Sequence, residues 1–238
     1  MNTIAQRRVV PELIDELPAH DPGAVHSRCD IRRINRVMGH VGIVASSLEP
    51  LLAARPSARL IELGAGDGTF LLRVAAWLQR RLPTPPVVEA WLVDRQPLLS
   101  IETVRKFARL GWKTREVTSD VFDWLGKRAG PAADVMLANL FLHHFEGDRL
   151  RLLLELMAAN GEAVIACEPH RSRFPLAAAG LLGLIGCNHV TRHDAVVSVK
   201  AGFAGDELSR LWPVPVGWRI KERRAGLFSH LFVARRRK

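Results

Sequence analysis

A glycine-rich turn, Gly64-Ala65-Gly66-Asp67-Gly68, constrains the fold of this chain more than any other feature. It follows a short apolar run at 59–63 and precedes an amphipathic segment at 69–81. Glycines at such a junction let the chain turn sharply, and they let a ligand approach the backbone where a Cβ would collide. The stretch therefore predicts a strand, a ligand-binding turn and a helix.

Short apolar runs alternate with helical ones along the rest of the chain. The predicted strands are 59–63, 87–93, 112–117, 134–138 and 162–167, and the predicted helices between them are 69–81, 97–110 and 147–159. Strands separated by helices of this length indicate right-handed βαβ units and a parallel sheet. Two further runs, 218–222 and 227–234, are joined by residues 223–226 and predict an antiparallel hairpin. We therefore expect an α/β three-layer sandwich with a mostly parallel seven-stranded sheet.

The composition excludes several classes of protein. No stretch reaches the roughly 18 to 20 apolar residues that a membrane-spanning helix needs, and the N-terminus has no apolar signal-peptide core. A cytoplasmic location is the default expectation. Cys29, Cys167 and Cys187 are far apart and lack the spacing of metal ligands, so they are interpreted as small buried hydrophobes and no metal site is predicted.

The formal net charge of +10 does not by itself predict a nucleic-acid partner. Arginines outnumber lysines 28 to 6, which a GC-rich coding bias would also produce. The basic residues are scattered along the chain, and the chain has no tyrosine to stack on bases. The sequence therefore favours a partner other than nucleic acid.

The spacing of the glycines within the turn restricts the class of ligand that the turn can bind. The pattern is GxGxG and not the GxGxxG of dinucleotide-binding enzymes, because position 69 is threonine. Asp67 inside the turn would repel a pyrophosphate but tolerates a ligand with a cationic end.

With Glu62 in front of it, the turn resembles the ExGxGxG motif of class I S-adenosylmethionine-dependent methyltransferases. The resemblance implies a Rossmann-like fold and S-adenosyl-L-methionine as cofactor. It implies that the turn lines the methionine portion, that an acid closing the second strand holds the ribose, and that residues after the third strand contact the adenine. The implied cofactor-binding residues are Glu62, Gly64, Ala65, Gly66, Gly68, Asp94, Arg95, Asp120, Val121, Phe122 and Asn139.

The segment after the fourth predicted strand, ANLFLHHF at 138–145, bears on the methyl acceptor. It departs from the Asn/Asp-Pro-Pro-Phe/Tyr pattern of enzymes that methylate base or glutamine amines, and it resembles small-molecule methyltransferases of the ubiquinone-biosynthesis type. A histidine is suited to deprotonate a hydroxyl near neutral pH. The candidate bases are His144 first, then His143 and His193, although each could equally be a structural histidine.

Two segments are expected to build the acceptor pocket. Residues 1–54 are predicted to form a helical cap, and residues 55–238 the methyltransferase domain with an apolar lid insertion at about 171–205. The basic residues at 32–36 either line that pocket or form a solvated helix face. The apolar segment 174–186 is expected to be buried, to form a lid or to contact a lipophilic partner. A second copy of this chain, which would give a homodimer, is one such partner.

The sequence therefore predicts an enzyme that methylates an oxygen atom of a hydrophobic small molecule (aromatic, quinone or polyketide-like). The alternatives left open are an RNA or protein methyltransferase that uses the basic surface, and a non-catalytic S-adenosylmethionine-binding module.

Overall fold

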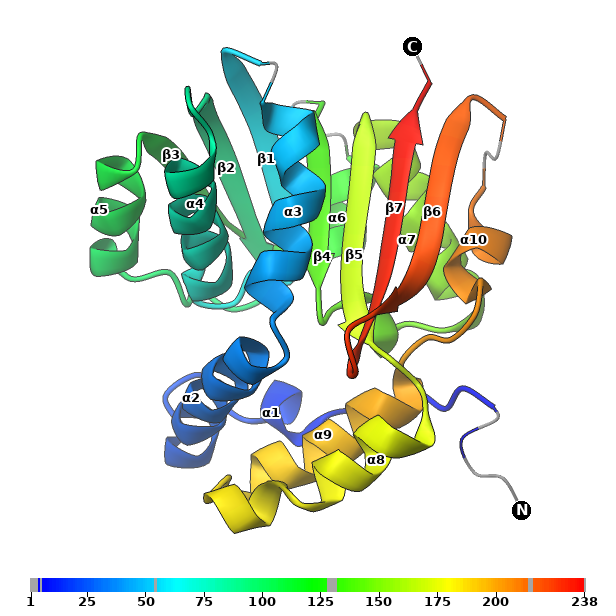
Figure 1. The fold of residues 1–238 in the computed structure, drawn as a ribbon. Helices are drawn as coiled ribbons and strands as arrows, with labels where there is room; N and C mark the ends of the chain where they lie inside the picture. The colour runs from blue at the N-terminus through cyan, green and yellow to red at the C-terminus, as the bar shows by residue number, and fades with distance from the viewer. Residues whose placement is uncertain (1–3, 5, 54, 128–131, 214–215, 238) are drawn as a thin grey trace.

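A seven-stranded sheet in the order β3-β2-β1-β4-β5-β7-β6 forms the centre of the molecule (Figure 1). The computed structural model describes the chain except residues 1–3, 5, 54, 128–131, 214, 215 and 238. The strands are β1 Ser57–Leu63, β2 Val87–Asp94, β3 Trp112–Thr118, β4 Val135–Asn139, β5 Ala163–Pro169, β6 Trp218–Ala225 and β7 Ser229–Arg236. The first five run parallel, and β7 pairs antiparallel with both β5 and β6. The predicted mixed sheet with a C-terminal hairpin is confirmed.

Helices cover both faces of this sheet (Figure 1). On one face lie α3 His40–Leu52, α4 Thr69–Arg81 and α5 Ile101–Arg109, and on the other lie α6 Val121–Gly126, α7 Gly147–Asn160 and α10 Glu207–Leu211. Successive strand residues point to opposite faces, so Leu60 enters one apolar core and Ile61 the other. Burial on both faces explains why the central strands read as continuous apolar runs.

A further group of helices lies beyond the carboxyl ends of the parallel strands (Figure 1). It consists of α1 Leu13–Glu16, α2 Pro22–Val37, α8 Arg173–Gly180, the 3-10 turn η2 Leu182–Ile185 and α9 His189–Ala201. Helix α9 packs against α1, α2 and α8, so the N-terminal segment and the segment after β5 meet at one edge of the sheet. Open α/β folds bind ligands at this edge.

The N-terminal 54 residues divide between two places. Asp21 caps α2 by accepting from Gly23 N and Ala24 N, and Gly39 at φ +70° ends it. Helix α3 then turns back onto the sheet, where Leu48 and Leu52 are buried. Only α1 and α2 of the predicted cap therefore lie over the edge; residues 1–3, 5 and 54 of that prediction lie outside the described residues.

Several element boundaries differ from those expected. The apolar segment 174–186 divides into α8 and η2, and its second half is exposed at Leu181, Leu184 and Ile185. Helices α1, α6 and α10 are missing from the predictions because four to six residues are too few to show a helical period. Of the helices that the structure describes, none is both long and apolar enough to cross a membrane.

Candidate active site

The glycine turn between β1 and α4 has the backbone that only glycine adopts readily. Gly64, Gly66 and Gly68 have φ of +66°, +55° and +71°. A Cβ built on Gly64 would lie 2.3 Å from the Phe141 ring, whereas one on Gly66 meets no atom within 4 Å. Gly64 is therefore required by packing within the protein, and Gly66 leaves open space above the turn.

The carboxylate of Asp94, the last residue of β2, supports this turn. Its Oδ2 accepts from Gly66 N at 2.8 Å, and its Oδ1 accepts from Gln96 N at 3.0 Å. Each carboxylate oxygen can accept a second hydrogen bond. Asp94 therefore fixes the turn and keeps acceptor capacity for a ligand with neighbouring hydroxyl groups.

Glu62 lies one residue before the end of β1 and is 2% exposed. Among the described residues, its Oε2 has no hydrogen-bond partner. Burial raises its pKa well above the usual value, and the nearby charges of Asp67 and Asp94 add to the effect. A buried polar atom without a partner is unfavourable, so this position favours a ligand that brings a donor or a cation.

An apolar wall continues from the end of β3 to the end of β4. Asp120 caps α6 through Phe122 N at 2.8 Å, and Val121 behind it is buried. The Phe122 and Phe145 rings meet edge-to-face at 5.4 Å, and Phe145 meets Phe141 in the same way at 5.2 Å. Three aromatic rings thus border the carboxyl edge of the sheet.

Asn139, the last residue of β4, is oriented by a histidine that the sequence analysis missed. His40, the first residue of α3, is fully buried, and its Nδ1 lies 3.1 Å from Asn139 Oδ1. Burial lowers the pKa of His40 to about 4, although the bond to Asn139 opposes this. A neutral His40 therefore donates from Nδ1 to the amide oxygen and holds Asn139 in place.

His143 and His144 form the 3-10 turn η1, Leu142–His144, directly after β4. His143 is 2% exposed and lies between two carboxylates. Its Nδ1 is 2.7 Å from Glu168 Oε2, and its Nε2 is 3.2 Å from Glu12 Oε1. Burial alone lowers its pKa, but the hydrogen bonds to Glu12 and Glu168 outweigh this and raise it to about 9. Both ring nitrogens therefore carry protons at neutral pH.

Glu168 on β5 fixes the conformation of this turn. Its side chain is fully buried, and Oε1 accepts from Phe141 N at 3.1 Å and from Leu142 N at 2.9 Å. The chain enters this turn from β4 through Leu140, a non-glycine residue with φ of +54°, a conformation that needs support from its surroundings. Glu168 supplies that support together with its bond to His143.

His144 is more accessible than His143, with 23% of its side chain exposed. Its Nδ1 lies 3.3 Å from Asp15 Oδ2 on α1. Burial lowers the pKa of His144, and the positive charge of His143 lowers it further. Asp15 also lies 4.0 Å from Arg95, whose side chain is 66% exposed, so Arg95 contacts α1 at the end of β2.

The short helix α1 brings Glu12 and Asp15 to the histidine pair, and the sequence analysis missed both. Asp194 on α9 holds the start of α1, accepting from Leu13 N at 2.8 Å and Ile14 N at 3.0 Å. A spacing of three places Glu12 and Asp15 on one side of a helical turn, which is the signal that could have found them.

His193 lies on α9 and is half exposed. Adjacent residues on a helix do not usually face each other, yet its Nδ1 lies 3.0 Å from Asp194 Oδ1. Because Asp194 also binds α1, the pair is part of the anchor of that helix.

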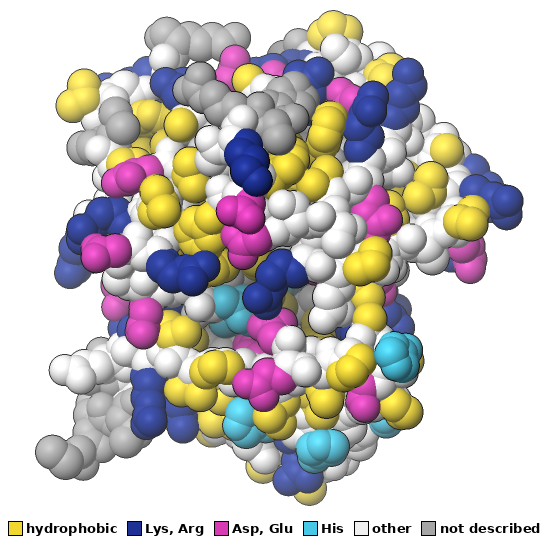
Figure 2. Space-filling model, turned by 180° about the vertical axis from the view of Figure 1, so that it is seen from behind, with side chains coloured by type: hydrophobic (Ala, Val, Ile, Leu, Met, Phe, Trp, Pro, Cys, Tyr) yellow, Lys and Arg dark blue, Asp and Glu magenta, His cyan; other side chains and the backbone are white. Residues whose placement is uncertain are grey.

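The view from behind shows acidic, basic and histidine side chains where the sheet domain meets the lower helices (Figure 2). The hydrogen bond between Glu12 and His143 and the close contact between Asp15 and His144 join the N-terminal segment to the sheet. The carboxyl edge of the sheet is therefore a polar, partly enclosed site.

We expect the Glu12–His143 pair to make stability depend on pH. The folded-state pKa of His143 is raised to about 9, so its contribution is complete below about pH 6.5 and is lost as the pH rises to about 9. Burial alone raises the pKa of Glu12, but the hydrogen bond to His143 and the positive charge of His143 lower it to about 2. The contribution of Glu12 to stability is therefore lost as the pH falls from about 4.5 to 2.

The measurement is the urea midpoint of the wild type and of Glu12→Gln at pH values from 6 to 9. The variant removes one of the carboxylates that raise the pKa of His143, so its midpoint should fall less over this range. Equal slopes for the two proteins would show that the pair does not titrate as described.

No protein-family model and no curated protein matches this sequence. Solved structures match it at low identity. An O-methyltransferase family protein from Burkholderia thailandensis is 19% identical with a TM-score of 0.59, covering 92% of this chain and 61% of that chain. Human N-acetylserotonin methyltransferase in complex with SAM is 14% identical, with a TM-score of 0.54 and coverage of 93% and 61%.

Magnesium protoporphyrin IX methyltransferase from Synechocystis with bound SAH is also 14% identical, with a TM-score of 0.51 and coverage of 84% and 83%. The chain thus spans about three fifths of the first two structures and most of the third. Together with the observed strand order, these matches establish that the chain has the Rossmann-like α/β fold of S-adenosylmethionine-dependent methyltransferases.

Proposed function

We propose that this protein is an S-adenosylmethionine-dependent methyltransferase that acts on a hydroxyl group of a hydrophobic small molecule. The observation that carries the proposal is the open glycine turn at Gly66, with Asp94 bonded to its backbone, together with Glu62 Oε2, which has no partner among the described residues. The structural neighbours support it, since they are named as methyltransferases and two hold SAM or SAH.

The residues of the site fit this cofactor. Its ammonium group offers a donor to Glu62, its vicinal ribose hydroxyls match the free lone pairs of Asp94, and its adenine ring matches the apolar surface at Phe122. Ala65 and Gly68 shape the turn, since Gly68 N donates to Ala65 O at 3.0 Å. When bound, the cofactor supplies an electrophilic methyl group on a sulfonium.

We assign the role of general base to His144. Its lowered pKa keeps the imidazole neutral at neutral pH, and Asp15 beside Nδ1 favours the tautomer with the proton on that atom. Nε2 is then free to take the proton of an acceptor hydroxyl while the oxygen receives the methyl group. His143 has both nitrogens bonded to carboxylates, so we propose that it positions the turn, and that His193 positions α1.

The acceptor pocket is proposed to lie between the Phe122, Phe141 and Phe145 rings and the helices α1, α2, α8 and α9. Methyl transfer is an in-line displacement, so the chain must align the acceptor and exclude water. A helical layer over the carboxyl edge can do both. A homodimer through the exposed Leu184 and Ile185 stays a prediction.

Replacing His144 by alanine should lower kcat by about 100-fold or more, because general-base catalysis by a histidine contributes on this scale. The affinity for S-adenosylhomocysteine should be unchanged, since His144 Nδ1 contacts Asp15 of α1 and His144 is not among the residues proposed to bind the cofactor. The measurement is single-turnover methyl transfer, with calorimetric titration of S-adenosylhomocysteine. His189→Ala, which removes an exposed histidine of α9, is the matched control. Wild-type turnover in both His144→Ala and His193→Ala would exclude histidine base catalysis.

The acceptor class is tested by labelled methyl transfer into a pool of phenols, quinols, polyketides and RNA. Label in the phenol, quinol or polyketide fraction supports the proposal. Label that appears only in RNA would overturn the small-molecule acceptor, and no shift in melting temperature with S-adenosylhomocysteine would overturn cofactor binding itself.

A further inference from the structure

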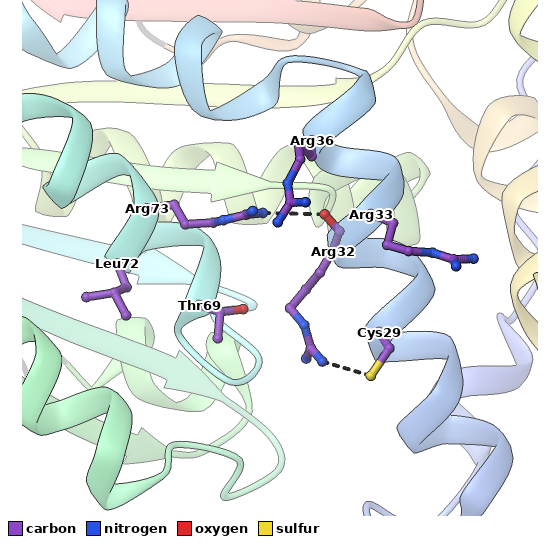
Figure 3. Close-up of a pocket in the computed structure, with 7 residues that line it drawn as sticks. All are labelled: Cys29, Arg32, Arg33, Arg36, Thr69, Leu72 and Arg73. Atoms are coloured by element: carbon purple, nitrogen blue, oxygen red, sulfur yellow. Dashed lines mark hydrogen bonds between the residues drawn. The ribbon is translucent and has the colours of Figure 1, made fainter.

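A cavity of about 330 Å³ lies between α2 and α4, next to the glycine turn (Figure 3). We call it the arginine pocket; its lining residues are Cys29, Arg32, Arg33, Arg36, Thr69, Leu72 and Arg73. Four of these seven residues are arginines, and none is acidic. The pocket therefore concentrates positive charge that comes from two different helices.

Two of these arginines have carboxylate partners outside the pocket lining. Arg32 is 2.8 Å from Asp67 of the glycine turn, and Arg33 is 2.9 Å from Asp30. Their positive charges are thereby compensated within the protein.

The other two arginines have no such partner among the described residues. Within the part of the chain that the structure describes, Arg36 contacts no carboxylate, and the contact of Arg73 is with the backbone oxygen of Arg32 at 3.4 Å. Two guanidinium groups that line the same cavity are therefore uncompensated, and like charges in this position repel each other.

The side chains converge from both helices. Residues 32 and 36 are four apart on α2 and so share one side of it. Figure 3 shows Arg36 and Arg73 reaching into the gap between α2 and α4, whereas Arg33 points away from it. Asn35 is buried, and its Oδ1 has no partner among the described residues. Asn35 therefore lies on the side of α2 that faces the protein interior.

A solvated basic face would carry arginines of one helix only, each directed to water. Here Arg73 of α4 faces the arginines of α2 across a cavity, and Asp67 joins Arg32 to the glycine turn. An oxyanion between the guanidinium groups would replace their repulsion with attraction. Guanidinium groups bind carboxylate and phosphate in a two-pronged geometry that water does not match.

We propose that the arginine pocket binds the phosphate or carboxylate group of a small-molecule ligand at the margin of the cofactor turn. Its volume is at the small end of ligand pockets and suits one anionic group with a short stem. The group has two sources: the carboxylate of the cofactor itself, or an acidic group on a second ligand. Identifying which source is correct rests on the proposed function, whereas the binding of an anion in the pocket does not.

The first arm titrates inorganic pyrophosphate into the protein at constant ionic strength. We expect binding to the wild type, and a loss of about 10-fold in affinity for Arg36→Ala and for Arg73→Ala, as for a hydrogen bond to a charged group. Arg80→Ala removes the same charge from an exposed site on α4 outside the pocket and should bind like the wild type. No binding to the wild type, or an equal loss in Arg80→Ala, would overturn the proposal.

The second arm separates the two sources. If pyrophosphate competes with S-adenosylmethionine, and Arg36→Ala weakens that cofactor more than its decarboxylated analogue, the pocket holds the cofactor carboxylate. If pyrophosphate binds undiminished to protein saturated with S-adenosylhomocysteine, the pocket serves a second ligand. Pyrophosphate binding without any binding of S-adenosylhomocysteine would support the arginine pocket and refute the proposed function.

Discussion

Replacing Gly66 by alanine should weaken the binding of S-adenosylhomocysteine by about 100-fold or more, which corresponds to about 2.7 kcal/mol. Gly66 has φ of +55°, and a Cβ there would meet no protein atom within 4 Å. The added methyl group would therefore stand in the open space above the turn, where the proposed cofactor must approach the backbone. The protein itself loses only the cost of a left-handed alanine, about 1–2 kcal/mol.

Gly111→Ala is the matched control for this variant. Gly111 has φ of +77° between α5 and β3, and a Cβ there also meets no atom within 4 Å. It should lose a similar amount of stability and bind S-adenosylhomocysteine like the wild type. Calorimetric titration and thermal unfolding of both variants measure the two effects. Wild-type affinity in Gly66→Ala would mean that no ligand passes over the turn.

The parts of this site that the sequence predicted are those encoded within one short segment. The glycine turn at 64–68 needs positive φ at fixed positions, and Asp94 is the last residue of a buried strand. Both patterns can be recognised in the sequence without knowledge of the rest of the fold. The parallel strands could also be predicted from the sequence, because burial on both faces requires an unbroken apolar run.

The contacts that were missed join residues far apart in the chain. Glu12 meets His143 across 131 positions, and His40 meets Asn139 across 99. Their placement depends on how α1 packs on α9 and how α3 packs on the sheet, which no local pattern encodes. Helix α9 was missed for a related reason, since it contacts α1, α2 and α8 and so lacks one clear polar face.

The predicted hairpin turn at 223–226 was wrong by a few residues. Strand β6 continues to Ala225, and the turn follows it. Arg223 and Arg224 are exposed on this edge strand, and charged residues protect such an edge from pairing with other chains. In the sequence, two adjacent charged residues after an apolar run are typical of the start of a loop, which is why the turn was predicted too early.

Replacing Glu168 by alanine should lower the free energy of unfolding by about 3–5 kcal/mol, the scale for removing one partner of a buried ion pair. The variant leaves the protonated His143 with one carboxylate, and it leaves Phe141 N and Leu142 N without their acceptor in the interior. Glu168→Gln keeps one acceptor oxygen and should lose less. Urea unfolding at pH 7 measures the three proteins.

Glu222→Ala separates loss of stability from loss of function. Glu222 has a nearly identical structural role away from the site: it accepts from Leu208 N and Ser209 N and lies 2.7 Å from His230 Nε2, with 2% of its side chain exposed. At a temperature where both variants are folded, Glu168→Ala should also lose methyl transfer, because the turn that carries His144 loses its support, whereas Glu222→Ala should keep it. Equal turnover in the two folded variants would mean that the turn holds its shape without Glu168, and that its strained Leu140 is fixed by packing alone.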